Sequence, residues 1–152
     1  MLVVIFMVTG VLMGTAFSAK KNASMTYQWV GEAITFAAQA ANQDGNLSLA
    51  ASREKDALQW FGYSFSQITD TTYNGHSFIP RGQSIYPGPI QLVSFSYIPP
   101  GYPVPDGIAS QPGYLAVLDV PVIGGELPFV GSQYVTVPMR YFGVIKSQVL
   151  TR

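Results

Sequence analysis

The first nineteen residues of the chain, MLVVIFMVTGVLMGTAFSA, contain no charged side chain, and Lys20 and Lys21 follow them directly. As an α-helix this segment would be about 28 Å long at 1.5 Å per residue. A bilayer's hydrocarbon core is about 30 Å thick. A helix that is apolar on every side has to be buried on every side. The segment is therefore expected to have one of three fates: it is removed as a secretion signal, it is buried in lipid, or it is buried among copies of the chain.

Each of the three fates has its own sequence evidence. Ala16-Phe17-Ser18 resembles a signal cleavage site, but no Lys or Arg precedes the apolar run, as a signal peptide requires. A retained anchor flanked only by Lys20 and Lys21 would leave the rest of the chain in the cytoplasm. The third interpretation takes Met1 as the residue exposed when a prepilin-type peptidase removes a short basic leader. The segment then waits in the membrane and later enters the core of a filament.

The helix is expected to continue past the lysines. Residues 24–41 contain no proline, and apolar residues recur there at spacings of three and four. We expect one helix from about residue 2 to about residue 42, apolar all round in its first half and amphipathic in its second. The stripe expected to pack against the rest of the chain comprises Met25, Trp29, Ala33, Phe36 and Ala40.

A second helix is expected after a turn at residues 42–46. Gly45 can take the left-handed conformation that ends a helix, and Asn46 or Ser48 can cap the next helix. We expect that helix to run to about Gln67, with Leu58, Phe61, Phe65 and Ile68 on its buried face. The charged run at 53–56 is expected to be a solvated surface.

After Thr69 the sequence changes to β-branched and aromatic runs separated by Gly and Pro, which predicts strands. We expect strands at 90–98, 114–120 and 133–150, the last one broken, with loops at 99–107 and 123–128. Pro121 and Pro138 lack a backbone donor and belong at edges or bulges. The predicted fold class is α+β, with residues 1–42 as a helical unit and residues 43–152 as a second helix and an antiparallel β-rich body.

The composition excludes several functions. The chain has eight basic and eight acidic residues and no cysteine, and 11% of it is charged, against about 25% in an average soluble domain. No basic face for nucleic acid is expected. The single histidine, His76, and the dispersed acids form no catalytic or metal-binding motif. We expect no enzyme, cofactor or metal, and we expect Asp119 to be an edge or interface hydrogen-bond acceptor.

Two Asn-x-Ser sequons start at Asn22 and Asn46. Each is an acceptor for N-glycosylation if the chain meets the machinery. Both are retained as candidate modification sites.

The layout resembles type IV pilin-like proteins, including their TadE-like and archaeal branches. Met1-Leu2-Val3-Val4-Ile5 stands where a mature pilin begins, and Val135 to Phe142 is similar to the last strand of TadE-like proteins. The resemblance implies a lollipop shape, with a long N-terminal apolar helix and a globular body. Typical bacterial pilins have glutamate at the fifth position, whereas this chain has Ile5, which argues against a standard bacterial major pilin. Archaeal-type pilins and more distant filament subunits are less tied to that glutamate.

The resemblance and the segment together predict a structural subunit of an extracellular pilus-like filament on the cell surface, which polymerises through its first helix. The expected partners are copies of the chain, the cytoplasmic membrane before assembly, a prepilin peptidase and the pilus assembly machinery. The alternative is a membrane-anchored assembly factor or a signal-anchored surface β-domain. The residues expected in the filament core are Met1, Val4, Ile5, Val8, Gly10, Leu12, Gly14 and Phe17.

Overall fold

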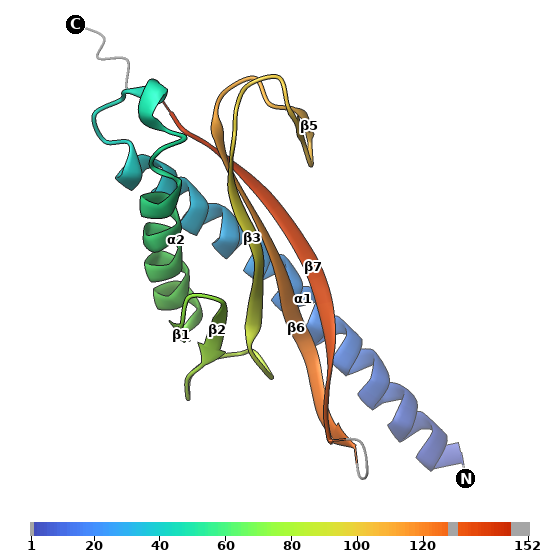
Figure 1. Cartoon of the computed structure of the whole chain (residues 1–152). Helices are drawn as coiled ribbons and strands as arrows, with labels where there is room; N and C mark the ends of the chain where they lie inside the picture. Colours follow the sequence, from blue (N-terminus) through green and yellow to red (C-terminus); the bar gives the residue numbers. More distant parts are fainter. Residues whose placement is uncertain (1, 128–130, 147–152) are drawn as a thin grey trace, which may run out of the picture.

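The computed structural model describes the backbone of residues 2–127 and 131–146, and the side chains of residues 18–124 and 134–146. The chain begins with helix α1 and continues through a short 3-10 helix η1 into helix α2 (Figure 1). Seven strands follow α2. The elements are α1 (Leu2–Ala41), η1 (Leu47–Leu49), α2 (Glu54–Thr69), β1 (Thr71–Tyr73), β2 (Ser77–Pro80), β3 (Ile90–Ile98), β4 (Pro103–Val104), β5 (Gly107–Ile108), β6 (Gly113–Leu127) and β7 (Gly131–Val144).

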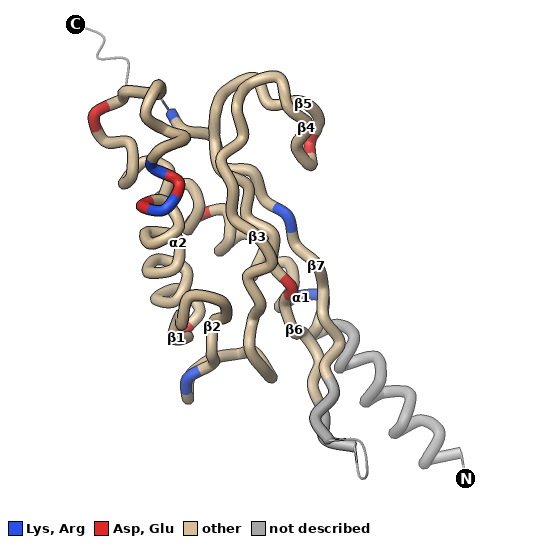
Figure 2. Tube along the Cα trace, in the orientation of Figure 1, with Lys and Arg blue, Asp and Glu red and all other residues tan. Residues whose placement is uncertain are grey.

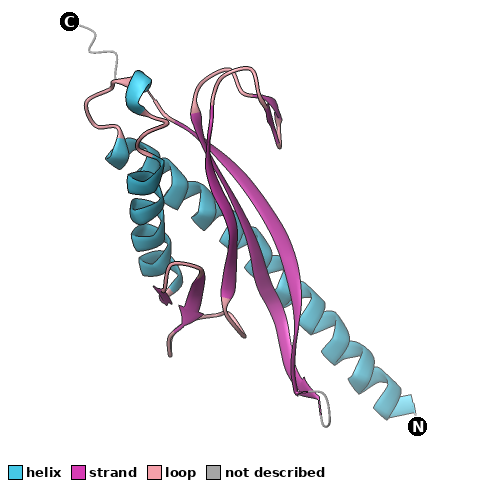
Figure 3. Cartoon of the chain, in the orientation of Figure 1, coloured by secondary structure: helices cyan, strands magenta, loops and turns pink. Residues whose placement is uncertain are grey.

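Five of the strands form one antiparallel sheet in the order β1-β2-β3-β6-β7, and β4 and β5 form a separate small hairpin. Both helices pack against the sheet, α1 mainly on β6 and β7 and α2 on β1 and β3 (Figure 3). The core between the helices and the sheet is built from small and aliphatic residues of α1, phenylalanines of α2 and alternate residues of β6. Its fully buried members include Val30, Ala33, Ile34, Ala37, Phe61, Phe65, Phe78, Ile90, Tyr114, Ala116, Leu118 and Val120.

The predicted fold class is wrong in its defining feature, the long apolar helix of a pilin-like lollipop. The structure is α+β with two helices and an antiparallel sheet, but the described part of α1, residues 18–41, is amphipathic. It carries Lys20, Lys21 and Glu32, all exposed, and also glutamines. Among the helices formed by described residues, none is both long and apolar enough to cross a membrane. The side chains of residues 1–17, on which the prediction rested, lie outside the described set.

The predicted extent of the first helix agrees with α1, but the predicted packing stripe is only partly right: Ala33 is buried and Trp29 packs against the core, whereas Phe36 does not. The α1 residues that are fully buried are Thr26, Val30, Ala33, Ile34, Ala37 and Ala38. Phe36, which was placed in the stripe, is 45% exposed. The inner face of α1 approaches the sheet closely. A Cβ added to Gly143 of β7 would lie only 2.9 Å from the Ile34 side chain. Because successive residues are turned by about 100°, a helix that points Ala33, Ile34 and Ala37 at the sheet turns Phe36 away from it.

The connection between the helices follows the predicted turn. Gly45 has φ +69°, and Asn46 Oδ1 accepts a hydrogen bond from the backbone of Ser48. This cap begins η1, and α2 begins only at Glu54. The Arg53 guanidinium donates two hydrogen bonds to the Asp44 carboxylate, at 2.6 and 2.7 Å. Arg53 therefore holds the turn, and the pKa of Asp44 is well below its usual range because of this pairing.

The β-rich part contains more strand than predicted. β1 and β2 were not expected, and the loop expected at 123–128 lies largely within β6, which runs to Leu127. The prolines are placed as predicted. The β6–β7 ladder has an irregularity between Pro121 and Ile123, and Pro138 lies in β7 at the edge of the sheet. Asp119, expected at an edge, lies in the inner strand β6 between β3 and β7.

Candidate assembly surface on the two helices

Three large aromatic side chains gather on the outer side of the helices, away from the sheet. Phe36 of α1 is 45% exposed, and Trp60 and Tyr63 of α2 are 40% and 59% exposed. Trp60 lies edge-to-face with both neighbours, with ring centroids 5.8 Å from Phe36 and 6.3 Å from Tyr63. We call Phe36, Trp60 and Tyr63 the aromatic face. Exposed clusters of this kind mark interaction sites more often than isolated exposed rings do.

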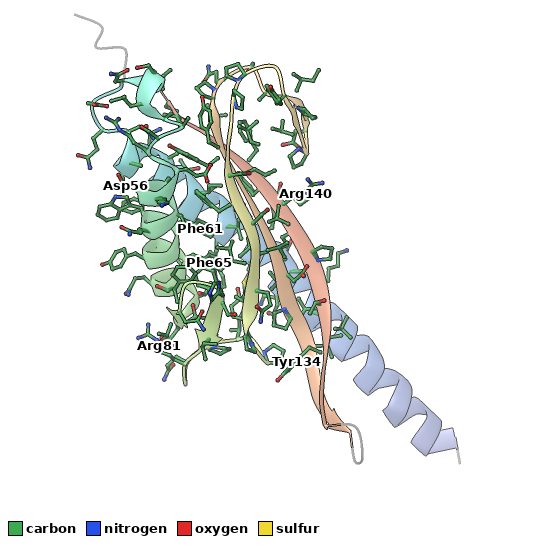
Figure 4. The ribbon with its side chains drawn as sticks, viewed as in Figure 1. Asp56, Phe61, Phe65, Arg81, Tyr134 and Arg140 are labelled. Carbon is green, nitrogen blue, oxygen red and sulfur yellow. The ribbon has the colours of Figure 1, made fainter. Side chains whose placement is uncertain are left out.

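The position of the aromatic face follows from the helical repeat of α2. Phe61 and Phe65 lie one turn apart and are completely buried against the sheet. Figure 4 shows these two rings on the side of α2 that faces the strands, with Asp56 on the other side. Because successive residues are turned by about 100°, burying Phe61 and Phe65 leaves Trp60 and Tyr63 on the outer surface.

Two hollows flank Trp60. One measures about 380 Å³ and is lined by Ala40, Ala41, Asp56, Gln59, Trp60 and Tyr63. The other measures about 470 Å³ and is lined by Phe36, Gln39, Ala40, Gln43 and Trp60. Trp60 and Ala40 belong to both. The surface thus has two shallow depressions that meet at the Trp60 indole, and Ala40 lines both of them.

The polar groups around the aromatic face are amides and one carboxylate. No Lys or Arg lines either hollow among the residues whose side chains are described. The Gln39 Nε2 atom is buried and has no hydrogen-bond partner among the described atoms. Figure 2 shows that the charged residues of this region gather toward the turn between the helices and leave most of α2 uncharged. This composition suits an apolar or neutral ligand better than an anion.

The outer surface continues along α1 toward β7. A groove there is lined by Gln28, Gly31, Glu32, Thr35, Phe36 and Tyr141, so Phe36 joins it to the aromatic face. The Tyr141 ring lies on Gly31, where an added Cβ would be 2.7 Å from the ring. Tyr27 packs beside it, with ring centroids 5.0 Å apart. Partial burial, and then the nearby Asp106 carboxylate, raise the pKa of Tyr27.

Buried hydroxyl groups hold α1 against the body from the inner side. The Thr26 and Tyr86 hydroxyls lie 2.6 Å apart, and burial raises the pKa of Tyr86 to about 12. Near the end of α1, Asn42 donates to the Tyr114 hydroxyl at 3.1 Å, and that hydroxyl donates to the Ala50 carbonyl at 2.8 Å. These contacts fix how α1 lies on the sheet and thereby fix the aromatic face.

The predicted modification sites are both found on the helical side of the chain. Asn22 is half-buried on α1, and its carbonyl accepts a hydrogen bond from the Thr26 hydroxyl. Asn46 is exposed, but its Oδ1 accepts from both the backbone and the hydroxyl of Ser48. The cap therefore already occupies the side-chain oxygen of Asn46. Glycosylation at either residue stays a prediction.

The predicted filament-core residues cannot be placed beside these surfaces. The side chains of Met1, Val4, Ile5, Val8, Gly10, Leu12, Gly14 and Phe17 lie outside the described residues. The aromatic face was missed by sequence reasoning, because Phe36 was assigned to the core. The signal that could have found it is the spacing of Trp60 and Tyr63, which leaves them off the face set by Phe61 and Phe65.

The structure places the candidate chemical residues apart. His76 is exposed in the turn between β1 and β2, where its backbone N–H donates to Asn74 Oδ1. Within the described ranges, no three His, Asp or Glu side chains come close enough to hold a metal ion. The charged run at 53–56 has structural contacts beyond the predicted solvated surface, because Glu54 accepts a hydrogen bond from the Tyr97 backbone at 2.8 Å.

No protein-family model, curated protein or solved structure matches this chain.

Proposed function

We propose that the chain is a structural subunit of an extracellular pilus-like filament and polymerises through the first nineteen residues. One observation carries the proposal. Helix α1 is continuous from Leu2 to Ala41, and the backbone of its N-terminal part diverges from strands β6 and β7 (Figure 1). The part of α1 that leaves the body is the part whose sequence has no charge.

The packing of α1 supports this division. Among the α1 side chains that the structure describes, residues 18–41, the buried ones run from Thr26 to Ala38, and Asn42 is buried just after the helix. The body thus holds the second half of α1 rigidly. An uncharged helical segment carried outside the body is unfavourable in water. Burial against neighbouring copies of the chain removes that surface from water.

The small residues in the segment favour helix–helix contact. Gly10, Gly14 and Ala16 occur within it, and residues of this size let helix backbones approach closely. Their packing supplies the stabilisation when the segment moves from lipid to protein, because lipid tails already shield apolar side chains from water. The role of the chain is assembly, with no catalysis, cofactor or nucleic acid.

The cellular route follows from the same segment. The chain is held in the cytoplasmic membrane before assembly, a prepilin peptidase processes it, and the pilus assembly machinery adds the subunit to a filament on the cell surface. The body forms the outer part of the filament, where proline-rich loops such as residues 99–105 contact neighbours or a target surface.

The test is electron microscopy of material sheared from cells, with mass spectrometry of the N-terminus of this chain. Filaments that contain the chain and retain the uncharged segment are expected. Ile5→Asp and Gly10→Lys are expected to abolish filaments and to leave the far-ultraviolet circular dichroism of the purified full-length chain unchanged. A chain that stays in detergent-extracted membranes would instead be an anchored assembly factor or surface β-domain. Filaments persisting in both variants would also overturn the proposal.

A further inference from the structure

We propose that the aromatic face is the docking site for the uncharged segment, residues 2–19 of α1, of a second copy of the chain. This inference rests on the proposed function and names the surface that receives the segment. It makes the subunit contact heterologous, with a donor helix on one copy and the Phe36-Trp60-Tyr63 surface on the next.

A copy cannot fill its own aromatic face. Leu2–Ala41 is one unbroken helix, and Phe36 on that helix is seventeen residues beyond residue 19. That separation is about 25 Å along a rigid rod at 1.5 Å per residue. Without a break the segment cannot fold back, so its partner surface must belong to another molecule.

The chemistry of the aromatic face matches that of the segment. The ridge formed by Trp60, with Ala40 at its foot and a hollow on each side, offers a shape into which side chains of a helix can interdigitate. The segment has small residues at Gly10 and Gly14 that would admit an indole ridge closely. Aromatic rings of this kind supply most of the binding energy where they are central to an interface.

The charges beside the segment and beside the aromatic face are complementary, which supports docking of the segment on this face. The segment ends in Lys20 and Lys21, both exposed. The acidic side chains nearest the aromatic face are Asp56, which lines one hollow, and Glu32, which lines the groove continuous with Phe36. Bringing a lysine pair to this acidic border is favourable, and the reverse orientation of the donor helix would forfeit the contact.

The contact produces an open-ended polymer. Each copy carries one donor segment and one acceptor face, and the two surfaces differ. A heterologous contact that does not close into a ring generates a filament. The aromatic face therefore supplies a reason for linear growth that the uncharged segment alone does not.

The first test compares polymer formation by purified full-length chains after dilution from detergent, measured by sedimentation and negative-stain microscopy. Trp60→Glu and Tyr63→Glu are each expected to reduce the sedimented fraction at least tenfold. The matched control is Val93→Glu, because Val93 is 57% exposed on strand β3 of the sheet and its replacement should leave assembly unchanged. Thermal melts establish that each variant remains folded.

The second test mixes two assembly-defective chains. Trp60→Glu keeps a working segment, and Gly10→Lys keeps a working aromatic face. Neither should polymerise alone, and a mixture should form a 1:1 dimer through the single remaining contact, detected by analytical ultracentrifugation.

The outcomes separate the two proposals. A wild-type chain that never polymerises overturns the proposed function and this inference together. A wild-type chain that polymerises, with folded Trp60→Glu and Tyr63→Glu variants that do so equally well, overturns this inference alone. A mixture that stays monomeric also overturns it. The Trp60→Glu variant could polymerise normally but no longer be retained on a polysaccharide column that retains the wild-type chain. That result would also overturn this inference, because it would make the aromatic face a sugar-binding site.

Discussion

Helix α2 presents aromatic rings on two opposite sides, and the two sets have different environments. On the inner side Phe61 is completely buried among Phe65, Phe78 and Phe95, with ring centroids 5.5, 6.1 and 5.5 Å away. On the outer side Trp60 and Tyr63 are packed only partly and are not covered by any described element. The comparison teaches that the inner rings stabilise the fold, whereas the outer rings remain available for contact with another molecule.

The largest expected effect on stability comes from the inner set. Phe61→Ala removes a ring from a fully enclosed site, so we expect it to lower the free energy of unfolding by about 3–5 kcal/mol. Chemical denaturation monitored by circular dichroism measures the change. A loss below about 1 kcal/mol would mean that the inner and outer rings do not differ as the structure indicates.

The next effect concerns a buried hydroxyl on the inner side of α1. The folded-state pKa of Tyr86 is about 12, since burial disfavours the phenolate, whereas an unfolded tyrosine titrates near 10. The neutral Tyr86 hydroxyl therefore contributes fully to the free energy of unfolding below pH 10. That contribution, about 2–3 kcal/mol, is lost as the pH rises to about 12. Denaturation at several pH values measures this slope, and Tyr86→Phe should flatten it. An equal slope in both proteins would contradict the assignment.

A smaller effect is expected where α2 touches β1. A Cβ on Gly62 would lie 2.5 Å from the Tyr73 ring, so Gly62→Ala should overpack this contact. The gain in helix propensity, about 1 kcal/mol, offsets part of the overpacking cost of about 1–3 kcal/mol, and we expect a net loss of about 1 kcal/mol in denaturation experiments. Gln67→Ala, at an exposed position of α2, is the control and should not destabilise. A Gly62→Ala protein that is more stable than the wild type would contradict the prediction, because it would mean that the Tyr73 ring shifts to make room for the added methyl group at no cost.

The smallest expected effect on stability comes from the outer set. Tyr63→Ala should change the free energy of unfolding by less than about 1 kcal/mol, because surface substitutions outside the core are usually tolerated. The same denaturation experiment measures it beside Phe61→Ala. A loss as large as that of Phe61→Ala would make the aromatic face part of the core and remove the distinction on which its docking role rests.

Sequence patterns predicted the elements better than they predicted which faces touch. The helix from residue 2, the turn at Gly45 and the strand at 90–98 follow from local preferences and are present. Phe36 was placed inside because hydrophobicity alone favours burying a large ring. The rotation of α1 that buries Ala33, Ile34 and Ala37 directs Phe36 away from the sheet. The contact between Ile34 and Gly143 on the buried face joins residues more than one hundred positions apart. The short strands β1 and β2 were missed because three or four residues carry little periodicity.

The contact between Ile34 and Gly143 also bears on how the chain acquires its fold. It joins the first element to the last strand, and such long-range contacts slow folding because a large loop must close before they form. During synthesis α1 is complete long before β6 and β7 exist. Its inner face, with Val30, Ala33 and Ile34, is therefore uncovered while most of the chain is still being made. A nascent chain in that state is prone to aggregate, so we expect its biogenesis to depend on a chaperone, or on prompt delivery to a membrane, until the final strand emerges.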